Sequence, residues 1–226
     1  MPGHGTELDP ETHGTFFYGD LLEALILALA KASGHRVEGL QDELEINGIK
    51  GHRDAVIDGM TVDVKSASSY SFQKFEFGQL RKDDPFGYIS QLSSYVYAGK
   101  DDPLVTDKER GAFLVVKKDR FKLCLDIHNF KEEIKHKEEE IDEVKKLMDQ
   151  SKPPKRGFSD IEDGYWKGKG KSRVWVPNGN LTLPAACGYC EYKKVCWPGL
   201  RAFAYSNGPK YYTKVINEPR VEEIDL

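Results

Sequence analysis

The chain has 226 residues, a formal net charge of −4, 39% hydrophobic residues and 31% charged residues. This composition is that of an ordinary globular protein, and no apolar run reaches the ~18 residues that a membrane span needs. The acidic balance argues against nucleic-acid binding by bulk electrostatics, because such domains usually carry a basic excess. We expect a soluble protein without a membrane partner, in which any contact with DNA is local.

Two sequence features bear on the expected cellular location. Residues 1–14 show neither an apolar signal core nor an Arg-rich amphipathic pattern. Three of the four cysteines lie between positions 187 and 196. Such crowding suits a metal site in a reducing compartment better than a disulfide framework. We therefore expect a cytoplasmic location.

The first predicted element is a helix from Gly19 to about Ser33, ended by Gly34. Its residues are helix formers and are apolar almost all round, so we expect it to be largely buried. Glu23 lies inside it.

Three short segments of alternating character follow, at 41–46, 49–57 and 60–68. The dipeptides Asn47-Gly48 and Asp58-Gly59 separate them, and both favour two-residue hairpin turns. The sequence therefore predicts two consecutive hairpins with defined registers.

Counting outward from the second turn pairs Ile57 with Met60 and places Asp54 opposite Asp63, with Cβ atoms roughly 5 Å apart. Lys65 shares their side of the sheet. The opposite side is apolar and suits a core, through Ala55, Ile57, Val62 and Val64. The first turn places Gln41, Glu43 and Glu45 on the face of Asp54.

Paired carboxylates need a compensating charge. Two like charges across a strand ladder destabilise it, and Lys65 neutralises half of the charge on Asp54 and Asp63. A hard divalent cation with oxygen ligands would compensate the rest. A solvent-facing strand pair with merely exposed charges is the alternative, but the registered pair, the core-facing valines and the upstream Glu23 favour a metal site.

The remaining segments complete an α/β pattern. A helix is predicted over 85–98, with Gln91 and Tyr95 on one face. Strands follow at 110–118 and 121–128, and then a long surface helix over 129–150 with a narrow apolar stripe. The prolines of the linker 151–157 end that helix. We expect a catalytic domain with an N-terminal arm at 1–150, and a linker with a cysteine module at 151–226 that packs back on it.

Cys187, Cys190 and Cys196 have the spacing of a metal knuckle, in which two thiolates of a C-x2-C turn grip one ion. Three free thiols packed as small apolar residues are the alternative. Cys124 lies in an apparent strand and is interpreted as a core residue.

Basic residues gather in local clusters that are candidates for DNA contact. A solvated surface is the alternative for each cluster taken alone. The clusters are the pair Arg81 and Lys82, the run 117–120, and the loop cations Lys167, Lys169, Lys171 and Arg173.

Five motifs, in this order, resemble the PD-(D/E)XK nuclease superfamily, in the RecB-like branch that includes the CRISPR-associated and AddB-type iron-sulfur exonucleases. The branch has a G-x-x-x-H or G-x-x-x-E helix, a G-x-x-D strand, a D/E-x-K strand, a helical Q-x-x-x-Y and a C-x2-C-x5-C. The matching segments are Gly19 to Glu23, Gly51 to Asp54, Asp63 to Lys65, Gln91 to Tyr95, and Cys187 to Cys196.

The resemblance implies a restriction-endonuclease-like α/β core, with a mixed central sheet flanked by helices and a C-terminal cysteine metal-binding module. It implies a DNA exonuclease dependent on Mg²⁺ or Mn²⁺ that leaves 5′-phosphates, acts on single strands or duplex ends, and serves recombination, repair or replication. A structure-selective or site-specific endonuclease and an inactive DNA-binding subunit are the alternatives.

The resemblance also implies residue roles. The divalent ion would be held by Glu23, Asp54, Asp63 and the carbonyl of Val64. Lys65 would position or deprotonate the attacking water, and Gln91 and Tyr95 would contact the phosphate or the water.

Two positions depart from the family pattern. Glu23 stands where many relatives have His, which favours harder ions. Iron-sulfur members supply a fourth cysteine from the N-terminal arm, and this chain has none before Cys124. His13 or His4 would complete a Cys3His zinc site, and a [4Fe-4S] cluster with an atypical fourth ligand is the alternative.

Overall fold

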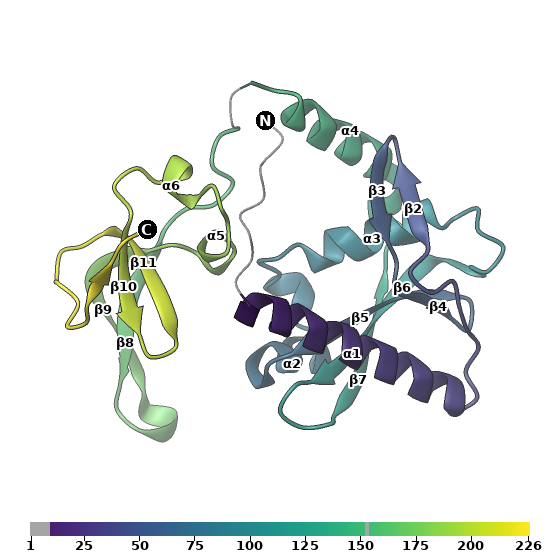
Figure 1. The fold of residues 1–226 in the computed structure, drawn as a ribbon, viewed down its shortest axis with the longest axis horizontal. Coiled ribbons are helices and arrows are strands. Elements are labelled where there is room, and N and C mark those ends of the chain that lie inside the picture. Colours follow the sequence, from purple (N-terminus) through teal and green to yellow (C-terminus); the bar gives the residue numbers. More distant parts are fainter. Residues whose placement is uncertain (1–9, 152–153) are drawn as a thin grey trace. The chain divides into compact units, whose positions relative to one another are not determined.

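The computed structural model describes residues 10–151 and 154–226. It divides into two compact units, Met1–Pro153 and Pro154–Leu226, each with its own five-stranded sheet (Figure 1). The division falls in the proline-bearing linker 151–157.

A mixed sheet forms the centre of the first unit, in the order β1-β4-β5-β6-β7. Strands β5 and β6 are parallel, and the other neighbours pair antiparallel. A parallel pair needs a crossover connection, which here contains two helices. The strands are β1 Val37–Glu38, β4 Ala55–Ile57, β5 Met60–Ala67, β6 Asp107–Lys117 and β7 Leu123–Asn129.

Helices cover both faces of this sheet (Figure 1). On one face α1 (Pro10–Ala32) packs Ile26 and Leu27 against Val64. On the other, α2 (Ser69–Glu76) and α3 (Tyr88–Ala98) pack Phe72 and Leu92 into a cluster with Phe113 and Val115 of β6. The unit is therefore a mixed α/β fold with a central mixed sheet flanked by helices.

Helix α1 differs from its prediction. It begins at Pro10 rather than Gly19, and it ends before Gly34, whose φ is +94°. Ile26 and Leu27 are buried, but Leu21, Leu25 and Leu29 are exposed. The expectation of a largely buried helix is wrong, because a single face of α1 meets the sheet.

Both hairpin registers are confirmed. Strands β2 (Glu43–Ile46) and β3 (Ile49–His52) form a separate two-stranded sheet that pairs Ile46 with Ile49, and β4–β5 pairs Ile57 with Met60. The turn residues have positive φ values, +50° and +85° at residues 47 and 48, and +51° and +83° at residues 58 and 59. These values are those of the type I′ turn that Asn-Gly and Asp-Gly favour.

The predicted strand 49–57 is interrupted at residues 53 and 54. Arg53 lies at this bend, and its side chain is fully buried. Its guanidinium forms ion pairs with Asp42, at 2.8 Å, and with Asp102. Gly39 makes room for it, since a Cβ there would lie 2.6 Å from the Nη2 atom. Arg53 thus joins the segment before β2, the bend and the loop after α3.

Other helix bounds also differ from the prediction. Helix α3 begins at Tyr88 rather than Pro85, and the Asp84 carboxylate accepts the backbone N–H group of Tyr88 at 3.0 Å. The sequence did not predict α2 or the 3-10 turn η1 (Leu80–Lys82). The predicted helix 129–150 is shorter, since β7 runs to Asn129 and is followed by η2 (Glu133–His136) and α4 (Lys137–Met148).

The second unit is an antiparallel sheet in the order β12-β10-β11-β9-β8, where the sequence predicted a cysteine module alone. Between its strands, Cys187 and Cys196 lie in two short helices and Cys190 lies in the segment that joins them. The elements are β8 Ile161–Lys167, η3 Gly170–Ser172, β9 Val174–Thr182, α5 Ala185–Gly188, α6 Lys193–Cys196, β10 Arg201–Tyr205, β11 Gly208–Lys214 and β12 Glu223–Ile224.

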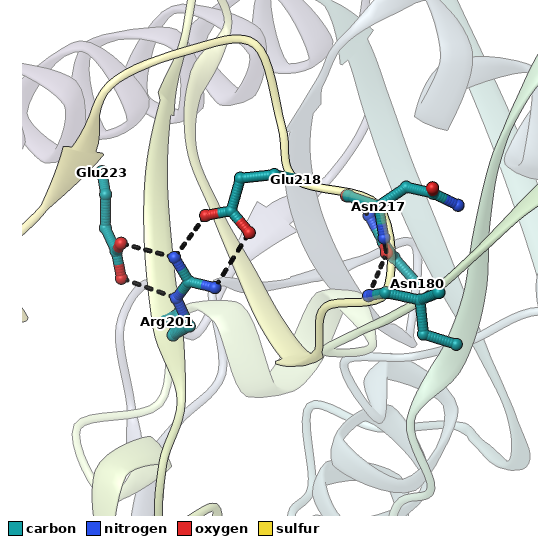
Figure 2. Close-up of polar contacts among 6 residues, drawn as sticks. Asn180, Arg201, Asn217, Glu218 and Glu223 are labelled. Atoms are coloured by element: carbon teal, nitrogen blue, oxygen red, sulfur yellow. Dashed lines mark hydrogen bonds and ion pairs between the residues drawn. The ribbon is translucent and has the colours of Figure 1, made fainter.

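Two sets of hydrogen bonds and ion pairs hold the C-terminal residues against this sheet (Figure 2). Arg201 of β10 donates to Glu223, at 2.6 and 2.8 Å, and to Glu218. Asn180 of β9 accepts the N–H group of Asn217 at 2.8 Å and donates to its carbonyl at 2.7 Å. The segment after β11 is thereby fixed to β9 and β10.

None of the helices in residues 10–151 and 154–226 combines the length and hydropathy that crossing a bilayer requires.

We predict that Arg53→Ala lowers the free energy of unfolding by about 3 kcal/mol, because it removes a buried side chain and leaves two carboxylates without their partner. Urea denaturation measures this loss. Arg36→Ala is the control, since the ion pair of Arg36 with Glu38 is exposed and contributes at most about 1 kcal/mol. Equal losses in the two variants would contradict the role given to Arg53.

Candidate active site

Strand β5 carries the two central residues of the site. Asp63 and Lys65 are two positions apart, so they project to the same face, which α3 covers. The Lys65 Nζ atom lies 2.6 Å from the Asp63 Oδ2 atom. Asp63 is only 2% exposed. The expectation that both residues point away from the core is therefore wrong for Asp63, because β5 is covered on both faces.

Asp54 reaches the same strand from the bend. The β4–β5 ladder begins at the pair Ala55 and Val62, so Asp54 lies just outside it and does not form the predicted ladder pair with Asp63. Its Oδ2 atom instead accepts the backbone N–H group of Val64 at 2.6 Å. The bend thus directs this carboxylate onto β5, beside Asp63.

Gln41 connects a third carboxylate to this pair. Its Nε2 atom donates to the Oε1 atom of Glu23 on α1 at 2.6 Å and lies 3.4 Å from the Asp54 Oδ1 atom. The backbone of Gln41 has a φ of +54° and donates its N–H group to the Asp54 carbonyl at 3.2 Å. No site role was predicted for Gln41, although the register of the first hairpin turn placed it on the face of Asp54.

Helix α3 closes the site with three side chains. The Oε1 atom of Gln91 accepts from Lys65 at 3.4 Å, and its Nε2 atom donates to the Tyr95 hydroxyl at 3.4 Å. Tyr88 places its ring 5.2 Å from the Lys65 Nζ atom. Tyr88 was not predicted. Its spacing of three residues before Gln91 on one helical face is the signal that could have found it.

The pKa values of the three carboxylates are raised, first by burial. Burial, then the neighbouring Asp54 and Glu23, raise the pKa of Asp63 to about 6, although Lys65 opposes this shift. Burial also raises the pKa of Asp54, and burial with the Asp54 charge raises that of Glu23. For Lys65 burial acts to lower the pKa, but Asp63 and Asp54 outweigh it and the pKa rises. Lys65 is therefore held as the ammonium form.

The chemical type of the donors suits a hard divalent cation, since Glu23, Asp54 and Asp63 offer carboxylate oxygens. A bound cation would also relieve the mutual repulsion of these carboxylates. Among residues 10–151 and 154–226, however, no group of three His, Cys, Asp or Glu side chains is arranged so that it could hold a metal ion. The carboxylates converge on β5 without forming a closed coordination shell.

The three cysteines of the second unit lie close together. Cys187 is in α5, Cys196 ends α6, and the Cys190 N–H group donates to the Cys187 carbonyl at 3.2 Å. Burial and these two neighbours raise the pKa of the Cys187 thiol. The same absence of a metal-holding group applies here, within the described part of the chain.

The two histidines proposed as fourth ligands both precede the second unit in sequence. His13 lies on α1, in the first unit, and His4 lies outside the described residues. Cys124 packs against the first core as predicted, where burial raises its pKa to about 11.

The predicted DNA-contacting cations occupy different settings. Arg81 forms an ion pair with Glu133 and donates to the Asn129 carbonyl at 2.7 Å, so it has a structural role. Lys82 is exposed at the end of η1. The cations of the second unit lie around the β8–β9 turn, in or next to η3, namely Lys167, Lys169, Lys171 and Arg173.

The chain was compared with family models, curated proteins and solved structures. No family model matches the chain. The curated proteins likewise contain no match. Among solved structures, the chain is similar to one titled "Crystal structure of SSO0001", at 15% sequence identity and a TM-score of 0.39, covering 80% of this chain and 70% of that one.

We predict a pH-dependent stability difference between the wild type and Asp63→Asn in EDTA. The pKa of Asp63 is about 6 in the folded state and ~3.9 when unfolded, so the folded state binds the extra proton between these values. The wild type should lose about 1–3 kcal/mol relative to the variant as the pH rises from about 4 to about 6, and no more above that. Urea denaturation at each pH measures it.

Asp58→Asn is the matched control, since it keeps the turn and removes a carboxylate whose pKa is lowered by its hydrogen bond to His35. Its difference from the wild type should have the opposite slope, at the acidic end of the series. A flat difference for Asp63→Asn between pH 4 and pH 6 would contradict the raised pKa of Asp63.

Proposed function

We propose that the chain is a divalent-metal-dependent DNA nuclease of the PD-(D/E)XK type, with a restriction-endonuclease-like core, and that it acts as an exonuclease leaving 5′-phosphates. One observation carries the proposal. Asp63, a buried carboxylate whose pKa is about 6, lies beside Lys65 and near two further carboxylates on separate elements. Strongly shifted groups that converge in this way are typical of catalytic sites rather than of cores.

The carboxylates would hold the ion. Glu23, Asp54, Asp63 and the carbonyl of Val64 are the donors that the family resemblance assigns to Mg²⁺ or Mn²⁺. Bound there, the ion would supply Lewis acidity for water activation and for the charge of the transition state. The hydrogen bond from the Val64 N–H group already fixes one oxygen of Asp54, which leaves the other, near Gln41, as the donor.

Lys65 acts through its charge. Because Asp63 and Asp54 keep it protonated, it serves better as a donor to a phosphate oxygen or to the attacking water than as a general base. The water oxygen attacks phosphorus and loses a proton to the solvent, the bond to the 3′ oxygen breaks, and that oxygen takes up a proton to become a 3′ hydroxyl. The phosphate stays on the 5′ oxygen of the other product.

Helix α3 supplies the groups that orient the substrate. Gln91 lies between the Lys65 ammonium and the Tyr95 hydroxyl, and so presents its amide next to both. We assign Gln91 and Tyr95 to the phosphate or to the attacking water. The ring of Tyr88 stabilises the Lys65 ammonium by a cation–π contact.

We predict that Asp63→Asn and Lys65→Ala each lower DNA cleavage at least about 100-fold, because each removes a charge that acts on the reacting groups. Release of end label from DNA with Mg²⁺ or Mn²⁺ measures cleavage, with EDTA as the blank, and circular dichroism shows that the variants fold. Asp101→Asn, at an exposed turn, is the control and should cleave as the wild type does. Cleavage that survives Asp63→Asn would contradict the proposal.

The form of the substrate distinguishes the class of nuclease in the same assay. An exonuclease degrades linear single strands and linear duplexes and spares the covalently closed circle. Cleavage of the circle would assign the chain to the endonucleases instead, and no cleavage of any form would point to a DNA-binding subunit.

We further propose that Cys187, Cys190 and Cys196 hold a structural metal ion, Zn²⁺ or the iron of a [4Fe-4S] cluster. We predict that Cys190→Ala loses this metal and lowers the melting temperature by several degrees, while cleavage per folded molecule changes little. Elemental analysis with an ultraviolet-visible spectrum separates zinc from iron. Cys124→Ala is the control that should keep the metal, and wild-type protein with neither element would remove this site.

A further inference from the structure

The β8–β9 hairpin presents exposed aromatic rings on one face. Trp166 and Trp175 are direct cross-strand partners, 57% and 40% exposed, with ring centroids 5.4 Å apart in an edge-to-face arrangement. The hairpin projects from the other strands of its unit (Figure 1). Two large indoles left open to water at the end of a hairpin are costly for folding alone, and such exposed aromatic surface is typical of binding sites.

Glycine fixes the position of one of these rings. A Cβ on Gly164 would lie 2.9 Å from two ring atoms of Trp175, so this indole lies against bare backbone. The ring is held by the strand beneath it and is still 40% exposed. The hairpin therefore offers exposed aromatic surface, from two rings at 67° to each other, whose orientation is set before any ligand arrives.

Cations gather at the turn next to the aromatic pair. Residues 164–178 include four Lys or Arg and no Asp or Glu, in a chain whose net charge is −4. The Arg173 guanidinium lies 5.4 Å from the Trp166 ring centroid. No carboxylate of residues 10–151 or 154–226 forms an ion pair with Lys167, Lys169 or Arg173. The positive charge is thus available to an outside partner.

We propose that this hairpin binds single-stranded DNA, with bases stacked on Trp166 and Trp175 and phosphates held by Lys169 and Arg173. Single-strand binding proteins combine the same two elements, aromatic platforms and a positive track. The inference deepens the proposed nuclease function, on which it rests for the role of the bound strand. It identifies single strands as the form of DNA that the second unit captures.

Two other partners fit the hairpin less well. A duplex stacks its bases internally and would leave the indoles without a ligand. A lipid bilayer would require apolar residues at the turn, but residues 168–173 between β8 and β9 are glycines, lysines, Ser172 and Arg173.

Binding of a fluorescent 20-nucleotide oligo-dT to the full chain in EDTA tests the proposal, because EDTA separates binding from cleavage. We expect Trp166→Ala to weaken binding about 10-fold and Trp166→Phe to restore most of the affinity. The double variant Lys169→Ala, Arg173→Ala should lower the slope of log affinity against log salt by about 1.4 in magnitude, since each phosphate contact contributes ~0.7.

Tyr70→Ala is the matched control. Tyr70 is an exposed aromatic residue in the first unit with the Lys74 ammonium 5.4 Å from its ring centroid, so it reproduces the cation–aromatic pair without the hairpin. Its affinity for oligo-dT should equal that of the wild type.

Any of three results would overturn the proposal. The first is unchanged affinity in Trp166→Ala, and the second is equal affinity of the wild type for a DNA duplex and for oligo-dT. The third is quenching of tryptophan fluorescence by anionic vesicles but not by oligo-dT. The outcome is independent of the nuclease assay. Binding without cleavage would leave the hairpin proposal standing and remove the nuclease, whereas cleavage that persists without hairpin binding would do the reverse.

Discussion

The buried ion pairs of Arg53 are the constraint on which the first unit depends. A strand from residue 49 to residue 57 would carry Asp54 along an unbroken ladder, but Arg53 turns inward to Asp42 and Asp102 and bends the chain. The bend releases Asp54 from the ladder, and its carboxylate then bonds to the Val64 N–H group. A fully buried guanidinium is costly to desolvate, so it persists where its partners are fixed. Here those partners also fix the position of a candidate metal ligand.

The burial of Asp63 opposes stability in the same region. Its carboxylate is desolvated and lies near two other acids, and Lys65 compensates only part of that cost. A core optimised for stability would place an apolar residue at this position of β5, as it does at Val62 and Val64. A carboxylate retained against such a cost is better explained by chemistry than by packing, because polar cores carry paired charges rather than an excess of one sign.

Local patterns predicted the parts of the site whose geometry is local. Two-residue turns set their registers through backbone φ angles, so Asn47-Gly48 predicted that Gln41 lies near Asp54, and Asp58-Gly59 predicted the pairs from Ile57–Met60 to Ala55–Val62. The predicted ladder pair of Asp54 with Asp63 does not form, because the bend takes Asp54 out of the ladder. The bend at Arg53 could not be predicted in this way, because Asp102 is distant in sequence. The exposure of Leu25 on α1 was not predicted for a related reason, since apolar periodicity does not say how many faces of a helix are covered. The sheet of the second unit was not predicted, because the three closely spaced cysteines were interpreted as a small metal-binding module.

The crossover from β5 to β6 explains why the buried Asp63 lies beside the polar side chains of the candidate site. Parallel neighbours require a connection that passes over one face of the sheet, and here that connection contains α3. The same helix that shields Asp63 from water therefore brings Gln91 and Tyr95 to Lys65. On the opposite face, α1 packs Ile26 and Leu27 on the sheet and presents Glu23, one turn earlier, to Gln41. The covering of β5 on both faces thus brings these residues together, and the bend at Arg53 and the segment before β2 add Asp54 and Gln41.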